Sequence, residues 1–182
     1  MQNSIDLTVS QVRGVVLASA KNDARYYLNG ALFDFKDGRV VATDGHCLLA
    51  LNVTATVRES GYPSVIVARE HLESIAKGGR VTDIITIFYG ESGLNLHREG
   101  GVDLDCTPID GKFPEYARVM PDKTSGDAGQ FDPDLMARIA KALRLACNAP
   151  KSLVPAVGHN GKSGAIVSTK SWGWTSRLRR PY

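Results

Sequence analysis

Short apolar runs, broken by polar turn residues, characterise the chain from residue 25 to residue 53. Three strands are predicted in this segment, at Tyr26–Phe35, Arg39–Thr43 and His46–Val53, because turn residues bound each run. The two joints, Lys36-Asp37-Gly38 and Asp44-Gly45, both contain Asp-Gly, which tolerates the positive backbone angles of tight turns. The segment is therefore expected to fold as consecutive antiparallel hairpins.

Apolar residues recur at helical spacing in three other segments. The first follows Thr8, which can form a capping box with Gln11, and the second ends at Gly78-Gly79. The third begins with Asp132 as a natural N-cap and Pro133 at the first helical position. The faces predicted to point to the core are Val12, Val15, Val16 and Ser19, then Leu72, Ile75 and Ala76, then Leu135, Met136, Ile139, Ala140 and Leu143.

The same order of elements is predicted three times along the chain. Each unit begins with a short apolar run, at Ile5, Val65 and Gln130, and continues with a helix and with apolar stretches broken by turn residues. After the opening hairpins, these stretches are Thr82–Tyr89, Gly93–Arg98, Val102–Cys106, Leu153–Val157 and Gly164–Ser168. Because repeats decide a fold more reliably than any single motif, the pattern predicts an α+β protein built from strand, helix and three strands in repetition.

Composition narrows the class of protein. The 182 residues are enough for one domain, or for one and a fraction, and 43% hydrophobic with 23% charged residues is ordinary for a soluble globular protein. No apolar run approaches a membrane span, and the N-terminus lacks the features of a secretory signal, so a cytoplasmic protein without a membrane partner is expected. A net charge of only +3 excludes a large basic field.

The candidate catalytic and metal-binding residues do not form a convincing site. Cys47, Cys106 and Cys147 are odd in number and widely spaced, which argues against a disulfide framework and a structural zinc site. Asp44 and His46 could share a face as metal ligands, but no third ligand stands at a suitable spacing. Adjacent strand residues His46 and Cys47 point apart, which disfavours a dyad. No enzyme, metal or cofactor is therefore expected.

Three blocks of sequence resemble a known family. RYYLNG at residues 25–30, VATDGH at residues 41–46 and IDGKFPEYARVMP at residues 109–121 are similar, in order and spacing, to the second domain of the bacterial beta sliding clamp. That family forms the ring that tethers replicative DNA polymerase to its template. The segment FDPDLMARIAKAL, at residues 131–143, looks most like the last half of the family's third domain.

The resemblance implies a fold and a domain organisation. Residues 1–121 are expected to form a complete sliding-clamp domain of two repeats, residues 122–129 a linker, and residues 130–182 a third repeat with a basic C-terminal tail. Each repeat would place its helix on one face of an antiparallel sheet. Because a half-domain exposes an apolar helix face and an open sheet edge, the third repeat is expected to pair with another chain in a homo-oligomer.

The resemblance also implies a function. The chain is expected to be a shortened clamp, a processivity factor that assembles around duplex DNA and binds polymerases or other partners through short hydrophobic peptides. The alternative is a clamp-derived module that binds clamp partners or a clamp subunit without encircling DNA. The groove positions implied are Leu28, Thr43, Gly45, His46, Leu48, Pro114, Arg118 and Val119. Apolar members would supply a slot, while Arg118 and His46 would hold polar groups at its rim.

Two departures from the family concern this groove. The family commonly has arginine where this chain has Cys47, which removes a charged donor from the pocket edge. The family's C-terminal tail, which forms the second half of the groove, is replaced by residues 175–182, whose three arginines are also typical of a disordered basic tail.

The helices are expected to carry the DNA contacts. A helical wheel places Arg138, Lys141 and Arg144 opposite the apolar face of the third helix. The resemblance implies contacts to phosphates without base reading, which weaken steeply with salt, whereas the alternative is an ordinary solvated face. The positions assigned to DNA are Arg13, Lys21, Arg25, Tyr27, Arg138, Lys141 and Arg144. Strand alternation predicts that Tyr26 and Tyr27 point to opposite faces.

Overall fold

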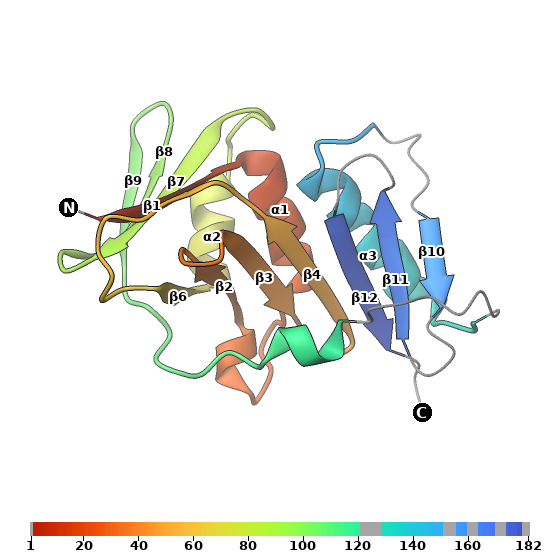
Figure 1. Cartoon of the computed structure of the whole chain (residues 1–182). Helices are drawn as coiled ribbons and strands as arrows, with labels where there is room; N and C mark the ends of the chain where they lie inside the picture. Colours follow the sequence, from red (N-terminus) through yellow and green to blue (C-terminus); the bar gives the residue numbers. More distant parts are fainter. Residues whose placement is uncertain (1, 121–128, 151–155, 160–163, 170–173, 180–182) are drawn as a thin grey trace.

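Two antiparallel sheets and a row of helices make up the molecule (Figure 1). The structure is a computed structural model and describes residues 2–120, 129–150, 156–159, 164–169 and 174–179. The helices α2, α1 and α3 lie in this order across the molecule, and α1 packs against both of the others. This arrangement confirms the expected α+β class.

The first unit contains the hairpins predicted between residues 25 and 53. Its elements are β1 (Asn3–Thr8), α1 (Val9–Ala18), the 3₁₀ helix η1 (Tyr26–Leu28), β2 (Gly30–Asp34), β3 (Arg39–Thr43) and β4 (Cys47–Asn52), followed by the short strand β5 (Ala55–Thr56). The second unit consists of β6 (Ser64–Ala68), α2 (Arg69–Ala76), β7 (Ile84–Gly90), β8 (Gly93–Arg98), β9 (Val102–Cys106) and the 3₁₀ helix η2 (Tyr116–Val119). The third consists of α3 (Pro133–Ala146), β10 (Ala156–His159), β11 (Gly164–Thr169) and β12 (Trp174–Arg179).

The first two units exchange their leading strands. One sheet has the order β5-β1-β7-β8-β9, so β1 of the first unit pairs with β7 of the second. The other sheet has the order β10-β11-β12-β4-β3-β2-β6, so β6 of the second unit pairs with β2 of the first. Each unit thus completes the sheet of the other.

The third unit extends the sheet of the first. Strand β12 runs antiparallel to β4, with Leu178 opposite Cys47 and Thr175 opposite Ala50. The interpretation of the C-terminal segment as a disordered tail is therefore wrong for residues 174–179, because an open strand edge 120 or more residues earlier in the chain supplies their hydrogen-bond partners. Residues 180–182 lie outside the described part.

Helices α1 and α3 cross at unusually close range. A Cβ atom on Gly14 would lie 2.7 Å from the backbone oxygen of Ala142, and the Ser10 hydroxyl donates to the carbonyl oxygen of Leu145 at 2.9 Å. Residues Ile139 and Leu143 of α3 are fully buried in the core that this crossing closes. The expectation that a half-domain leaves an apolar helix face exposed is wrong here, since α1 of the same chain covers it.

The capping box expected at the start of α1 is confirmed. The Thr8 side chain accepts from the Gln11 backbone N–H at 3.2 Å, and the Gln11 side chain accepts from the Thr8 backbone N–H at 2.8 Å. Asp132 likewise caps α3, as expected, by accepting from the backbone N–H of Asp134 at 2.8 Å.

Two strands predicted from the sequence differ in the structure. The run Tyr26–Phe35 is a 3₁₀ turn followed by a strand from Gly30, because the Asn29 amide exchanges hydrogen bonds of 2.9 Å with the backbone of Asp23 and closes a loop there. Tyr26 and Tyr27 thus lie outside any strand, and their rings meet edge to face at 5.7 Å. The leading strand expected at Gln130 is likewise not a strand in the structure.

Two further predictions fall partly or wholly on residues that the structure leaves undescribed. Of the strand expected at Leu153–Val157, only Ala156 and Val157 are described, and they belong to β10. The expected linker at 122–129 lies outside the described residues except for Gly129. In the described part of the chain, no helix is long and apolar enough to cross a membrane.

Candidate functional site

A tight turn between β3 and β4 forms the centre of the site. The Thr43 hydroxyl donates to the Cys47 carbonyl oxygen at 2.7 Å and accepts from the Gly45 backbone N–H at 3.0 Å. One carboxylate oxygen of Asp44 accepts from the backbone N–H groups of His46 and Cys47 at 2.9 and 2.8 Å. Gly45 has φ of +90°, a conformation that other residues rarely adopt. The Asp-Gly pair thus makes a rigid turn, as its sequence predicts.

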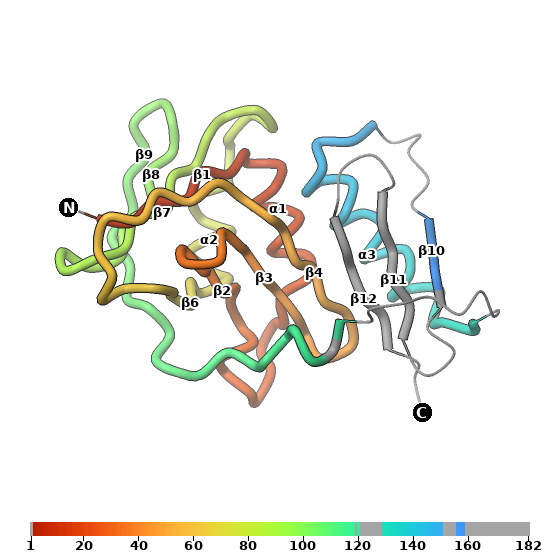
Figure 2. Tube along the Cα trace, in the orientation of Figure 1, coloured from red at the N-terminus to blue at the C-terminus, as the bar shows by residue number. Residues whose placement is uncertain are grey.

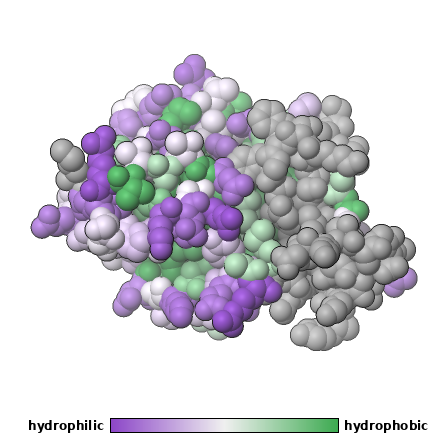
Figure 3. All heavy atoms as spheres, in the orientation of Figure 1, coloured by the Kyte–Doolittle hydropathy of each residue, from purple (hydrophilic) through white to green (hydrophobic). Residues whose placement is uncertain are grey.

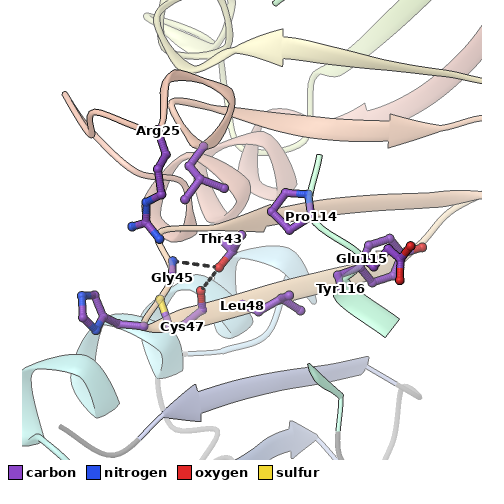
Figure 4. Close-up of a pocket in the computed structure, with 10 residues that line it drawn as sticks. Arg25, Thr43, Gly45, Cys47, Leu48, Pro114, Glu115 and Tyr116 are labelled. Atoms are coloured by element: carbon purple, nitrogen blue, oxygen red, sulfur yellow. Dashed lines mark hydrogen bonds between the residues drawn. The ribbon is translucent and has the colours of Figure 1, made fainter. Parts of the chain in front are cut away.

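A pocket opens beside this turn (Figure 4). Arg25 reaches toward Gly45 at one side, and Pro114 and Tyr116 lie at the other. The cavity of about 180 Å³ is lined by Arg25, Leu28, Thr43, Gly45, His46, Cys47, Leu48, Pro114, Glu115 and Tyr116. Small-molecule sites are commonly larger, at about 300–1,000 Å³, so this pocket suits one or two side chains of a larger ligand.

The segment after β9 forms the outer wall of the pocket. It runs below β6 and β2 toward β4 (Figure 2), and Ile109 donates from its backbone N–H to the Ile66 carbonyl oxygen at 3.0 Å. Phe113 of this segment is buried against Leu48 and Val41, on the face of the sheet that the helices leave open. The face shown in Figure 3 carries hydrophobic patches among hydrophilic residues. Apolar packing thus holds Pro114 and Tyr116 beside the turn.

Charged groups surround the turn. The Arg138 guanidinium of α3 forms an ion pair with the second carboxylate oxygen of Asp44 and donates to the Cys47 sulfur at 3.2 Å. Arg25 pairs with Asp23 at 2.7 Å and donates to the Asp44 carbonyl oxygen at 3.3 Å. Where the resemblance expects an arginine at the pocket edge, this chain therefore has Cys47, and the Arg138 guanidinium of α3 contacts its sulfur from outside the pocket.

The environment of the turn shifts two pKa values. Burial opposes ionisation of Asp44, but the backbone N–H groups of Cys47 and His46 and the Arg138 charge outweigh it, so the pKa of Asp44 lies below its ordinary value. Burial, with the charge of Asp44, raises the pKa of the Cys47 thiol to about 12. Cys47 therefore stays protonated near neutral pH, which removes the thiolate that nucleophilic catalysis would need.

The structure brings most of the expected groove residues together. Six of the eight line the one pocket, namely Leu28, Thr43, Gly45, His46, Leu48 and Pro114. Arg118 is exposed on η2 and pairs with Glu115, and the side chain of Val119 lies outside the described part. Sequence reasoning did not assign Glu115 and Tyr116 to the groove, although their place beside Pro114 in the FPEYARV segment was the available signal.

The basic residues assigned to DNA have different surroundings. Arg13 donates to the carbonyl oxygens of Ala76 and Gly79 at 3.0 and 2.9 Å, so it caps the end of α2. Arg138 and Arg25 pair with carboxylates, and Tyr27 is half-buried beneath Tyr26. Lys21 and Lys141 are exposed and Arg144 is half-buried, and none of these three forms an ion pair with a described residue.

The fold and the pocket together define a class of protein. Two interlocked antiparallel sheets with helices beside them, and a small pocket beside a tight turn, are features of a protein of the sliding-clamp type. Among the described residues, no three His, Cys, Asp or Glu side chains are grouped so that they could hold a metal ion. Residues 2–115 match the family of the DNA polymerase III beta subunit, central domain, and the chain belongs to that family.

Individual relatives agree with this assignment. The beta sliding clamp of Pseudomonas aeruginosa is 36% identical in an alignment of 112 residues that covers 57% of this chain and 29% of that protein. The beta sliding clamp of Escherichia coli is 30% identical in an alignment of 131 residues that covers 66% of this chain and 35% of that protein. The chain therefore spans about a third of the length of the curated relatives it matches. Both relatives are named as sliding clamps, in agreement with the expectation that this chain is no enzyme.

Solved structures extend the likeness of fold to almost the whole chain. The sliding clamp from Bacillus subtilis superposes with a TM-score of 0.74 over 98% of this chain and 64% of that one, at 13% identity. The clamp from Pseudomonas aeruginosa gives a TM-score of 0.69 over 98% and 66%, at 18% identity. At these identities the comparison shows the fold alone, and it confirms the expected sliding-clamp fold.

Proposed function

We propose that this chain binds short hydrophobic peptide segments of DNA polymerases or other replication proteins in the pocket beside the β3–β4 turn. The observation that supports the proposal best is that six groove positions, separated by up to 86 residues, converge on one cavity. Leu28, Leu48 and Pro114 supply apolar surface, while His46 and Glu115 supply polar groups at its rim. A pocket of this size takes the side chains of an extended peptide.

Fluorescence polarisation with a labelled hexapeptide tests this proposal. The probe carries leucine and phenylalanine at alternating positions, and its matched control has serine in their place. We expect the apolar probe to bind, and His46→Ala and Tyr116→Ala to weaken it about fivefold to tenfold, since both side chains are accessible at the pocket. Lys112→Ala, on the exposed segment outside this pocket, should leave affinity unchanged. Equal affinity for both probes would contradict the proposal.

Arg118 needs a separate variant because it does not line the cavity. We propose, from its place in the family pattern, that it holds a polar group of the peptide beyond Glu115, with which it pairs. Arg118→Ala should then weaken the probe in a salt-sensitive way, since the side chain is 80% exposed. An unchanged affinity at low salt would exclude Arg118 from the groove.

A second candidate function is assembly around duplex DNA as a processivity factor. The exposed Lys21 and Lys141 and the half-buried Arg144 lie on or next to helices and are available for phosphate contacts. Within the described residues, β9 and β10 each pair on one side only, so the two sheets have edges at which further copies could add. The alternative is a module that binds clamp partners without encircling DNA.

Retention on circular and on linear DNA distinguishes a closed ring from a module that does not encircle DNA. A ring should remain on nicked circular DNA during gel filtration and run off after the DNA is linearised, whereas a module should show no such difference. Lys141→Ala should lower retention at low salt, because each phosphate contact contributes to the salt-dependent affinity. If neither form of DNA retains the protein at low salt, the ring proposal fails and the peptide proposal stands.

A further inference from the structure

We propose that Arg138 is a positioning residue of the pocket, and that through Asp44 it holds the β3–β4 turn in the shape that receives a ligand. The inference rests on the proposed peptide binding, because it names the residue that sets the shape of that same site. Arg138 does not line the pocket. It comes from α3, in the third unit, 94 residues after Asp44. The third unit thereby contributes a residue to a site whose lining residues belong to the first two units.

The argument begins with the two oxygens of the Asp44 carboxylate. One accepts from the backbone N–H groups of His46 and Cys47, at 2.9 and 2.8 Å, and both of these residues line the pocket. The other oxygen binds Arg138. A carboxylate is a rigid plane, so a guanidinium that fixes one oxygen also fixes the direction in which the other oxygen accepts. Arg138 therefore acts on the backbone of the pocket through a single intervening group.

Burial makes this contact stronger than an ordinary surface ion pair. The side chains of Asp44 and Arg138 are only 13% and 35% exposed. The Arg138 Nε atom is buried and has no hydrogen-bond partner among the described residues, so the guanidinium depends on its contacts to Asp44 and to the Cys47 sulfur. Salt screens such a pair less than an exposed one, and removing one partner leaves an uncompensated charge.

A rigid element presents the Arg138 side chain. The α1–α3 crossing leaves no room for a Cβ atom at Gly14, and the Ser10 hydroxyl fixes the end of α3 by donating to Leu145. Close packing of this kind does not deform gradually. The position of α3, and with it the position of the guanidinium, is therefore set by the core and not by the turn that it holds.

A double-mutant cycle measured with the labelled apolar hexapeptide tests the inference. Arg138→Met keeps the aliphatic stem of the side chain and removes its charge, and Asp44→Asn keeps an oxygen that can accept from the turn. We expect each variant to weaken the peptide about tenfold, and the double variant to be no weaker than either single one, because the two residues act as one unit. Arg80→Met, which removes the exposed cation of the ion pair between Arg80 and Asp83, is the matched control and should bind normally.

Hydrogen exchange of the backbone amides of His46 and Cys47, measured by nuclear magnetic resonance, gives a second readout that needs no peptide. Both amides donate to the Asp44 carboxylate, so Arg138→Met should speed their exchange several-fold while Arg80→Met should not. The double variant, which buries no unpaired charge, keeps the test valid if a single variant folds poorly. Circular dichroism and melting temperature report folding for every variant.

The outcomes separate this inference from the proposed function. If the native protein binds no peptide, the proposed function fails, and hydrogen exchange of the His46 and Cys47 amides alone decides whether Arg138 holds the turn. If it binds but Arg138→Met binds equally well, or if the two single losses add in the double variant, the positioning role is overturned while peptide binding stands. A weaker peptide complex without faster exchange of the His46 and Cys47 amides also overturns it.

Discussion

Asn3 shows how one polar residue can organise a distant loop. It is fully buried, and its amide nitrogen donates to the carbonyl oxygens of Glu59 and Tyr62 at 2.9 and 2.8 Å. Its oxygen accepts from the backbone N–H groups of Arg58 and Glu59 at 2.6 and 2.8 Å. Every polar atom of the amide is satisfied, which is the condition under which a buried polar side chain stabilises a fold. The alternating pattern of β1 predicts that position 3 faces inward but gives no reason for asparagine there.

Gly45 is the residue of the β3–β4 turn that is expected to tolerate substitution least. Gly45→Ala would place a side chain at φ of +90°, which costs about 1–3 kcal/mol, and its Cβ would lie 2.9 Å from the Arg25 guanidinium. We expect a lower melting temperature and a weaker peptide complex. Gly61→Ala is the matched control, because open space surrounds Gly61 and its φ is not positive. Thermal melts and fluorescence polarisation check both variants, and equal behaviour of the two would contradict this account of the turn.

Asp44 predicts a specific dependence on pH. Because its pKa in the folded protein lies below the ordinary value of 3.8, the ionised carboxylate contributes stability above that pH and loses it as pH falls through the folded pKa. Asp44→Asn lacks this contribution at every pH. The difference in urea midpoint between the native protein and Asp44→Asn should therefore be constant from pH 7 to pH 5 and shrink below about pH 4. A difference in urea midpoint that grows below about pH 4 would contradict the expected direction of this pH dependence.

At the scale of elements, the close crossing of α1 and α3 decides where the third unit sits. Helical periodicity predicts which face of α3 is apolar, and the structure buries Ile139, Ala142, Leu143 and Ala146. Periodicity does not reveal which helix that face meets. Gly14 lies inside a helix, where glycine costs about 1 kcal/mol relative to alanine. Such a residue is typical of a helix that another backbone approaches closely.

Gly14→Ala should lower stability despite the better helix propensity of alanine. The new Cβ would meet the Ala142 backbone oxygen at 2.7 Å and the Ala146 backbone nitrogen at 3.0 Å, and a backbone cannot yield as a flexible side chain can. Overpacking of this kind costs about 1–3 kcal/mol, which exceeds the gain in propensity. Hydrogen exchange should quicken in α3 more than in α2. Ser74→Ala, on the exposed part of α2, is the control, and a stabilised Gly14→Ala would contradict the crossing.

At the scale of the molecule, sheet edges and not helix faces are the surfaces available for the proposed assembly. The apolar face of α3 is covered within the chain, whereas β9 and β10 are terminal strands of their sheets among the described residues. The edge strand β9 carries the exposed Asp103 and Asp105. Charged residues on an edge strand disfavour non-specific pairing with strands of other chains. Any self-association through β9 is therefore expected to be specific and sensitive to charge.

We predict that the protein is larger than one chain at micromolar concentration. Light scattering coupled to gel filtration measures the mass. Asp103→Lys and Asp105→Lys, each of which reverses the charge of the β9 edge, should shift the distribution of species, while Glu70→Lys on exposed α2 should not. A monomer at all concentrations would contradict a homo-oligomeric ring but would leave peptide binding by a single chain in place.

The sequence by itself determined the local features of this protein. Local signals act over a few residues, and they include the Asp-Gly joints, the Thr8 capping box, the Asp132 cap and helical periodicity. The hairpins, helices and repeated units could therefore be predicted from them. The resemblance to the clamp family implied most of the residues that line the pocket. Only the tertiary structure decided that β12 pairs with β4, that Arg13 caps α2 and that Arg138 holds Asp44. These contacts join residues more than 60 positions apart, and a local pattern contains no information about which distant partner will satisfy a strand edge or a charge.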